Sequence, residues 1–592
     1  MRTILNNFVS ERSNLLLWLY RIVLGVIFLA AWHFRSLLPS LPLMDSDTCQ
    51  YLFPAVHSLS TGHYLPTWRT FPYPSFLTAL LWLSPQLEII PRVQHILGIG
   101  TAALIILAFQ RLKAFLPKDP AVHWATRLIA LVGVYLFLFS SFEITVEHTI
   151  RPEALVPIAC VMTLLTGVEF SRRVFLEGRR DGLAALYATL LIITAVANYH
   201  LKPAWGLVTL TSLLPLMIAW VRISGRWTWK LLASLPGIFL ATIFFTLPEH
   251  WLQKKLPDNN FLPTTLLCTH SEFLEDIVQK DALRSDLPYR TALLQFAQDI
   301  RSAIRHPARH RYGLSLDPDD IMYRGPLERL TQALSDDGIS LTRFCYYYYF
   351  HTWKEHPVLM LWKIKKQMEY FYTPKKINIY AADHDLHLPK NYQDSLRCLI
   401  DAKYPTQQSD PPSHSENSHL ARKNIVCIFD AKYPPWRPLD DYEHGLQSLH
   451  LAKELTLPYG LQCIHRLANN LFFPLLLLDL IAAAVVLFSR NNLFSELRPA
   501  VFCMLYLASF NFFNCLTIAI IHMMDVWRYH FSQIVMSVVS QGFGILFLVA
   551  FISHWLRRQS HFQSISGPGD GRERLSSVPA GARLGENQAS EI

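Results

Sequence analysis

The chain has 592 residues, of which 51% are hydrophobic and only 17% are charged, and its formal net charge is +9. Soluble domains carry about 25% charged residues, so this composition argues against a soluble enzyme and against a disordered protein. Most of the positive charge lies between apolar runs, where it sets membrane orientation, and no nucleic-acid partner is expected.

Long apolar runs dominate the sequence. A membrane-spanning helix needs about 20 mostly apolar residues. Ten candidate runs are Leu15–Phe34, Val93–Phe109, Trp124–Ser141, Pro152–Glu169, Leu183–Ala197, Pro203–Val221, Trp229–Leu247, Leu467–Phe488, Pro499–Ile521 and His530–Leu556. The run Phe76–Leu83 is too short to cross and predicts a helix at the membrane interface. The sequence therefore predicts a mainly α, polytopic helical membrane protein with about ten spans and a juxtamembrane helix in its first exoplasmic loop.

Basic residues concentrate in alternate connections, as expected for loops that face the cytoplasm. With the N-terminus in the cytoplasm, the opposite connections hold only Arg35, Arg69, Arg92, Arg151, Lys202 and Arg528. The first apolar run lacks a small-residue cleavage site, so we expect an anchor rather than a signal peptide. The expected location is a bacterial inner membrane, in the cell envelope, with the site facing the periplasm; a lumenal site in the endoplasmic reticulum follows the same topology.

Four segments follow from this topology. Residues 1–247 form a membrane module with seven spans, and its first exoplasmic loop covers 35–92. Residues 248–463 form a mostly helical exoplasmic segment, and residues 464–556 return with three spans. The tail 557–592 is polar and rich in Gly and Ser, which predicts a disordered cytoplasmic segment.

One stretch of the exoplasmic segment, His351–Tyr372, is amphipathic, with Lys on one side and Trp, Leu, Met and Phe on the other. It fits a helix on the membrane surface and, equally, a helix packed in the segment's own core.

Carboxylates, imidazoles and cations gather in the exoplasmic connections. These residues are Asp45, Asp47, His57, His63, Tyr64, Arg69, Glu143, Glu147, His148, Arg151, Glu153, Asn198, His200, Lys202, Glu249, His250, His522, Asp525, Arg528, Tyr529 and His530. Well inside the spans only Arg21 and Asp479 are charged. Each residue taken singly fits a solvated span end, but the set fits a site whose substrate lies at the exoplasmic interface.

The first exoplasmic loop carries an ordered series of residues. Its members are Asp47, Tyr51, Ala55, Leu59 and Gly62, followed by Arg69, Tyr73 and Pro74. This series resembles the first exoplasmic loop of the GT-C superfamily of membrane glycosyltransferases, and most closely the branch of the protein O-mannosyltransferases and the lipid A aminoarabinose transferases. It departs from that pattern in the spacing between Arg69 and Tyr73, and because Thr48, not a second acid, follows Asp47.

Two further stretches agree with this resemblance. Thr149–Glu153 resembles the Arg-Pro-acid sequence that opens the fourth span of this family, and Asp525–Tyr529 resembles its late Arg-Tyr pair. The resemblance covers residues 10–250 well and 464–556 loosely, and the segment 248–463 lies outside it.

The resemblance implies a glycosyltransferase of GT-C type whose donor is a sugar on a polyprenyl phosphate. The acceptor would be a lipid, a glycan or a protein. An inverting transfer needs a base for the acceptor hydroxyl, and Asp47 is the first choice, with Asp45 as the second acid. The alternative is that Asp45 or Asp47 caps the helix that carries Tyr51.

The leaving phosphate needs cations. Arg528 is the first candidate, followed by Lys202, Arg69 and Arg151, although Arg151 could instead pair with Glu147 or Glu153 to fix its loop. The other expected substrate contacts are Tyr51, Tyr73, Glu147, His148, Glu153, His200 and Tyr529.

Three alternatives stay open at this point. Asp45 and Asp47 could ligate a divalent cation with help from Glu147 or His148. The protein could be a transporter or flippase of a lipid-linked sugar, although its spans carry few polar residues near the midplane. It could also be a membrane-anchored assembly factor that works through 248–463.

Overall fold

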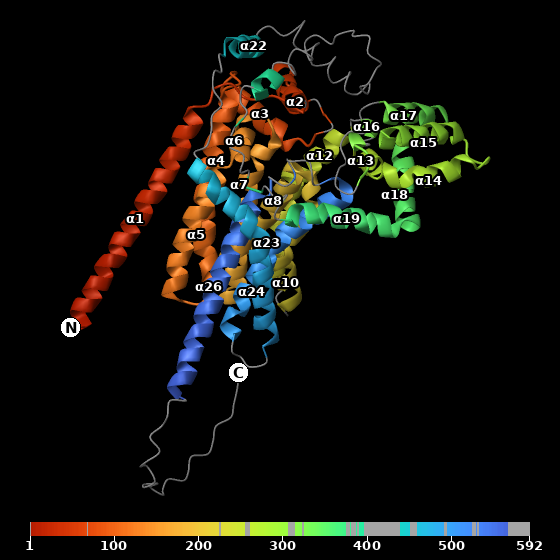
Figure 1. Ribbon diagram of the computed structural model, residues 1–592. Helices are drawn as coiled ribbons and strands as arrows, with labels where there is room; N and C mark the ends of the chain where they lie inside the picture. The colour runs from red at the N-terminus through yellow and green to blue at the C-terminus, as the bar shows by residue number, and fades with distance from the viewer. Residues whose placement is uncertain are drawn as a thin grey trace.

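The computed structural model is a bundle of long helices with a smaller helical body at one end (Figure 1). It describes residues 2–45, 47–64, 66–67, 69–223, 227–254, 261–305, 314–322, 325–373, 379–380, 386, 390–395, 438–449, 459–489, 494–523, 529 and 532–565. No strand occurs within these residues.

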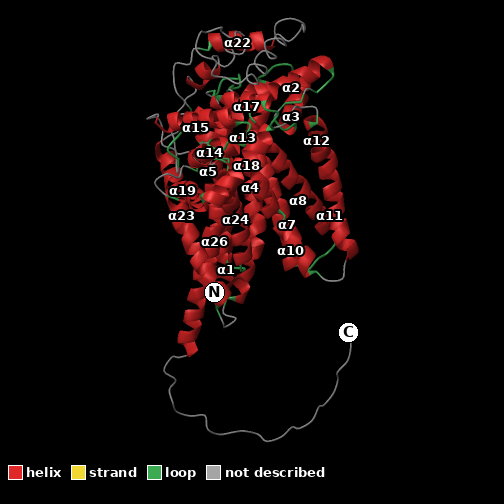
Figure 2. Cartoon of the chain, turned by 90° about the vertical axis from the view of Figure 1, so that its right-hand side faces the viewer, coloured by secondary structure: helices red, strands yellow, loops and turns green. Residues whose placement is uncertain are grey.

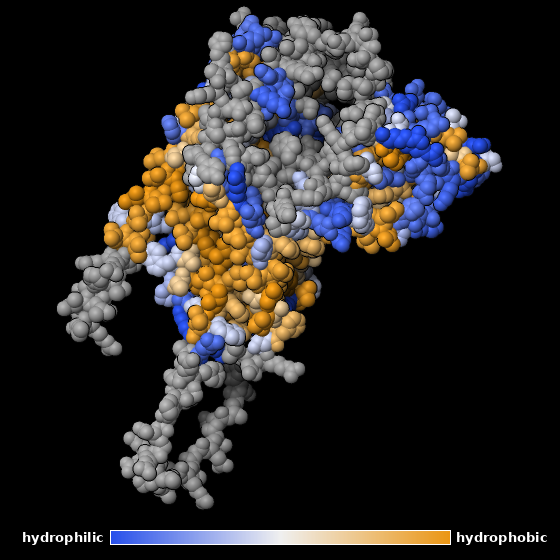
Figure 3. All heavy atoms as spheres, in the orientation of Figure 1, coloured by the Kyte–Doolittle hydropathy of each residue, from blue (hydrophilic) through white to orange (hydrophobic). Residues whose placement is uncertain are grey.

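Among the described residues, ten helical segments are long and apolar enough to cross a membrane, in agreement with the predicted number of spans. They are built from α1 (Arg2–Ser36), α4 (Ile89–Leu112), α5 (Pro120–Leu138), α7 (Val156–Ser171), α8 (Gly182–Leu201), α9 (Gly206–Ser212) with α10 (Leu214–Arg222), α11 (Trp227–Ala241) with α12 (Leu247–Gln253), α23 (Tyr459–Phe488), α24 (Arg498–Ile521) and α26 (Ile534–Ile565). Apolar side chains cover most of the face of the bundle that Figure 3 shows.

The two ends of the bundle differ. The terminal end holds the start of α1 and the end of α26 (Figures 1 and 2). The loop end holds three short helices, α2 (Thr48–Thr61), α3 (Pro72–Leu83) and α6 (Ser141–His148). The helix α3 includes the run Phe76–Leu83 and has 12 residues, too few to cross a membrane, as predicted.

The segment after the seventh span, termed the insertion here, also lies at the loop end. Its described helices are α13 (Phe261–Thr269), α14 (Ser271–Ala282), α15 (Arg290–Arg305), α16 (Pro318–Met322), α17 (Pro326–Asp336), α18 (Leu341–Glu355), α19 (Pro357–Tyr372) and α22 (Pro438–Ser448). The helices α13 to α18 share their own apolar core, built around side chains such as Phe296, Leu334 and Tyr348.

Close helix contacts in the bundle depend on small residues. Phe109 of α4 lies against Gly133 of α5 and Gly542 of α26. An added Cβ would overlap the Phe109 ring at Gly542, and at Gly133 it would overlap Val538 of α26. A side chain at either glycine would therefore force apart the helices α4, α5 and α26, which contribute to the bundle core.

Some element ends differ from the apolar runs. The third span ends at Leu138, and Ser140 then accepts a hydrogen bond from the Glu143 N–H to start the separate helix α6, which hydropathy alone does not reveal. At the other end of the chain, α26 continues beyond Leu556 to Ile565, and the rest of the predicted tail lies outside the described residues.

Candidate functional site

The first and second loops of the loop end are joined by a short parallel pairing. Leu43 N–H donates to the carbonyl of His148 at 2.8 Å, and Ile150 N–H donates to the carbonyl of Leu43 at 3.0 Å. This pairing brings the acids that follow Leu43 next to Arg151, more than 100 residues later in the chain.

Asp45 caps the first turn of α2. Its Oδ1 accepts hydrogen bonds from the backbone N–H groups of Asp47 (2.8 Å) and Thr48 (3.1 Å), while Oδ2 pairs with Arg151. Asp47 occupies the N-cap position, but its side chain makes no capping bond. Of the two alternatives raised by the sequence, the capping role therefore falls to Asp45.

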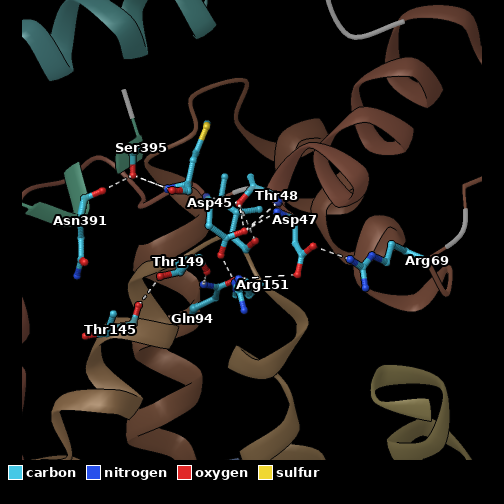
Figure 4. Close-up of polar contacts among 12 residues, drawn as sticks. Asp45, Asp47, Thr48, Arg69, Gln94, Thr145, Thr149, Arg151, Asn391 and Ser395 are labelled. Carbon is cyan, nitrogen blue, oxygen red and sulfur yellow. Dashed lines mark hydrogen bonds and ion pairs between the residues drawn. The ribbon is translucent and has the colours of Figure 1, made fainter. Parts of the chain in front are cut away.

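The Asp47 carboxylate lies between two arginines (Figure 4). Arg69 Nη2 donates to Asp47 Oδ1 at 2.6 Å, and Arg151 Nη2 lies 3.8 Å from Asp47 Oδ2. The side chains of Asp47 and Arg69 keep 19% and 21% of their surface exposed, so a ligand can reach this pair from outside. Arg151 is more deeply buried; burial works against its charge, but the nearby Asp45 and Glu153 raise the pKa of Arg151.

Two buried tyrosines, Tyr51 and Tyr73, pack behind Arg69. Arg69 lies over the Tyr51 ring, 5.3 Å from its centroid, and Tyr51 meets Tyr73 edge to face. The Tyr73 hydroxyl donates to Gln94 Oε1 at 2.8 Å, and Gln94 in turn donates to the backbone carbonyls of Glu147 and Thr149. Burial raises the pKa values of both tyrosines. The structure thus surrounds Tyr51 and Tyr73 with protein and makes them supports for Arg69.

A buried polar chain lies deeper in the bundle. Arg35 at the end of α1 donates two hydrogen bonds to the Glu147 carboxylate, at 2.6 and 3.0 Å. His95 Nδ1 lies 2.9 Å from the same carboxylate, and His95 Nε2 lies 3.2 Å from His148 Nδ1. Gly98 on α4 leaves the room that Glu147 occupies, since an added Cβ would overlap the carboxylate.

The far end of this chain fixes where its protons lie. Tyr392 donates its hydroxyl proton to the carbonyl of Leu41 (2.6 Å), so its oxygen accepts from His148 Nε2–H at 2.7 Å. His95 lies between His148 and Glu147, with its Nε2 3.2 Å from His148 Nδ1 and its Nδ1 2.9 Å from the Glu147 carboxylate. The two histidines thus link Tyr392 to the buried carboxylate.

The pKa values of the groups outside the spans follow from these contacts. Burial opposes ionisation of Glu147, but Arg35 and His95 hold its pKa below the ordinary value. Burial and the neighbouring His95 lower the pKa of His148 to about 3, so His148 stays neutral. Burial and repulsion from Glu147 raise the pKa of Glu143 well above its ordinary value. Glu147 and His148 are therefore buried residues that bond to other side chains in the interior, and they are not exposed to a ligand.

Lys202 belongs to a second group at the same end of the bundle. Its ammonium donates to Ser532 Oγ at 2.7 Å and lies over the rings of Tyr529 (5.4 Å) and Trp205 (6.0 Å). His200 is also buried and stacks on Phe245. Of the predicted members of this late loop, Asp525, Arg528 and His530 lie outside the described residues.

The insertion reaches back to hold the first loop. Ser395 Oγ accepts from the N–H of Met44 and lies 2.9 Å from the Met44 carbonyl oxygen (Figure 4). Tyr442 of α22 donates to the carbonyl of Pro42 at 2.7 Å. The residues before Asp45 are thus held by hydrogen bonds from residues 351 and 400 positions later in the sequence.

The donor set at Asp45 and Asp47 does not fit a divalent cation. Both carboxylates already pair with arginines, and the Glu147 carboxylate turns to Arg35 and His95 instead. Nowhere in the described part of the chain do three or more His, Cys, Asp or Glu side chains form a metal-binding group.

Sequence reasoning missed the second layer of this site. Arg35, Gln94, His95, Tyr392 and Ser395 are all buried and all bond to the predicted residues or their loops. A signal existed for Gln94 and His95, because two polar residues side by side near the start of an apolar span are costly unless they have partners. For Tyr392 and Ser395 the sequence offers none.

Fold and site together define a multi-pass helical membrane protein with a partly buried charged site at one end of its bundle. No protein family model, no curated protein and no solved structure matches this chain.

Proposed function

We propose that this protein is a membrane glycosyltransferase that moves a sugar from a polyprenyl-phosphate-linked donor to a hydroxyl of a lipid, glycan or protein acceptor. The proposal rests on one arrangement above all, the partly exposed Asp47 carboxylate between Arg69 and Arg151 where the first helix meets the loops. The ordered series from Asp47 to Pro74, which resembles the GT-C first loop, supports it independently.

In the proposed reaction, the acceptor hydroxyl oxygen forms a bond to the anomeric carbon of the donor. The bond from that carbon to the phosphate oxygen breaks, and its electron pair leaves with the lipid phosphate. Asp47 takes the hydroxyl proton as general base. Asp45 stays in its capping role and keeps Arg151 beside the reacting groups.

Cations near Asp47 stabilise the charge that develops on the departing phosphate. Arg69 is the most exposed of those described and presents a planar guanidinium suited to a phosphate. Lys202 of the second group would complete the proposed clamp. The sequence also predicts a role for Arg528, which lies outside the described residues. The expected surroundings are a bilayer that holds the lipid tail, with the sugar at its exoplasmic surface.

The test uses the purified chain in lipid nanodiscs with a radiolabelled polyprenyl-phosphate sugar and measures release of the lipid phosphate. Asp47→Asn should lower turnover by about 10²- to 10⁴-fold, since it removes the general base. The matched control is Asp286→Asn, which breaks an exposed pair with Arg284 in the insertion and should leave turnover unchanged. Full turnover by Asp47→Asn would rule out Asp47 as the base.

A second candidate function, transport of a lipid-linked sugar, is favoured by one observation. Asp479 lies within the span α23, only 3% exposed, and its Oδ1 has no hydrogen-bond partner within the described residues. Acids buried within spans often mark ion or substrate pathways. Uptake of the donor into proteoliposomes without a new glycosidic bond would favour this function over transfer.

A further inference from the structure

The helix α19 buries polar side chains that a helix at the surface of a water-soluble body would expose to solvent. The side chains that it buries recur at helical spacing and include Lys363 and Gln367, both 0% exposed, between Met360 and Phe371. A soluble surface helix buries apolar side chains and exposes polar ones. The exposed side chains of α19 are therefore expected to contact something other than water.

Lys363 fixes the height of α19 on the bundle. Its ammonium donates to the carbonyls of Ala519 and His522, both at 2.8 Å, and lies 3.3 Å from His270 Nε2. The two carbonyls belong to the last turn of α24 and the residue after it, where the ninth span ends. A lysine here satisfies carbonyls that a helix end leaves without partners. The helix α19 is thus held level with the end of a span, and it extends sideways from the bundle (Figure 1).

The outward face of α19 is apolar in its first half and carries charged side chains such as Lys365 and Glu369 further along. Val358, Leu361 and Trp362 are 75%, 58% and 45% exposed, and Phe350 at the end of α18 is 63% exposed. Figure 3 shows apolar side chains along the edge of the insertion that faces the spans, beneath its polar outer surface. Contiguous apolar surface of this kind marks an interaction site.

We propose that this face, formed by Phe350, Val358, Leu361 and Trp362, lies in the interface of the lipid bilayer beside the spans. Two observations favour lipid over another protein as its occupant: α19 is held level with the end of α24, and the face lies along the edge of the insertion nearest the apolar surface of the bundle. A tryptophan beside an exposed Lys365 is also typical of a helix at the headgroup level. The insertion is then a body anchored in the membrane surface, whichever reaction the site performs.

The experiment replaces Leu361 with the photoreactive amino acid benzoylphenylalanine in the full chain. The chain is placed in nanodiscs of phosphatidylcholine and phosphatidylglycerol and irradiated, and adducts are identified by mass spectrometry. Phospholipid adducts are expected at Leu361 and, in a second variant, at Val358. The control position is Gln332, an exposed residue of α17 in the same body, and it should give none.

Absence of lipid adducts at both Leu361 and Val358, in protein that elutes like the parent chain, would overturn the proposal. So would cross-links from both positions to a second copy of the chain. Phospholipid adducts at Gln332 with the same yield would also overturn it, because they would show contact without a specific face.

Discussion

Two acids of the first loop, separated by one residue, have different tasks because their surroundings differ. One carboxylate oxygen of Asp45 accepts hydrogen bonds from backbone N–H groups, and the other pairs with Arg151. Asp45 therefore has a structural role. Asp47 makes no capping bond and keeps a partly exposed carboxylate. The two acids are of the same residue type, and they differ in the direction in which each side chain points.

The Arg35–Glu147 pair gives a prediction about stability. Both side chains are 2% exposed, so Glu147→Gln leaves a buried guanidinium without its counter-charge and should lower the free energy of unfolding by about 3–5 kcal/mol. Chemical denaturation in detergent micelles measures it. The control Glu88→Gln breaks the exposed pair with Arg92 and should cost about 0–1 kcal/mol. Equal losses for the two variants would contradict a structural role for the buried pair.

At the scale of elements, the site is assembled by segments that are far apart in sequence. The first loop pairs with the second through Leu43, and α4 supports both through Gln94. The insertion adds hydrogen bonds from Tyr392, Ser395 and Tyr442. Removing the insertion would therefore remove contacts from the loop that carries Asp45, and we expect this segment to be needed for the site.

Ser395→Ala tests this dependence at a single contact. The substitution leaves the buried Met44 N–H without an acceptor and should destabilise the fold by about 1–3 kcal/mol in the same denaturation experiment. Ser448→Ala removes an exposed hydroxyl that bonds only within its own helix, and it should change stability by less than about 0.5 kcal/mol. If Ser395→Ala matches this control, the insertion does not hold the first loop through Ser395.

At the scale of the whole molecule, ten spans and two unlike ends define a topology. The first loop should lie on one side of the membrane, and the connection between the fourth and fifth spans on the other, because three spans separate them.

Cysteine labelling tests this topology. His63→Cys, in the first loop, and Arg180→Cys, in the later connection, both place the thiol at an exposed position. An impermeant maleimide added to intact cells should label the first and should reach the second only after permeabilisation, with the parent chain as background. Labelling of both from the same side would refute the ten-span arrangement.

Sequence reasoning went furthest where one physical signal dominates. The number of spans and the short α3 follow from hydropathy and length, since lipid admits only long helices whose backbone groups are satisfied internally. The start of α6 was missed because a single capping serine decides it. For the site, sequence placed Asp47, Arg69 and Arg151 at one end of the bundle but did not reveal which acid pairs with which arginine.

What the sequence determined by itself is the number of candidate membrane spans, because apolar length acts locally along the chain. Only the tertiary structure decided that Asp45 caps α2, that Arg35 and His95 contact the Glu147 carboxylate, and that Ser395 holds the first loop. These contacts join residues tens to hundreds of positions apart, or depend on the direction of one side chain. Their energies depend on burial and distance, which no local pattern in the sequence records.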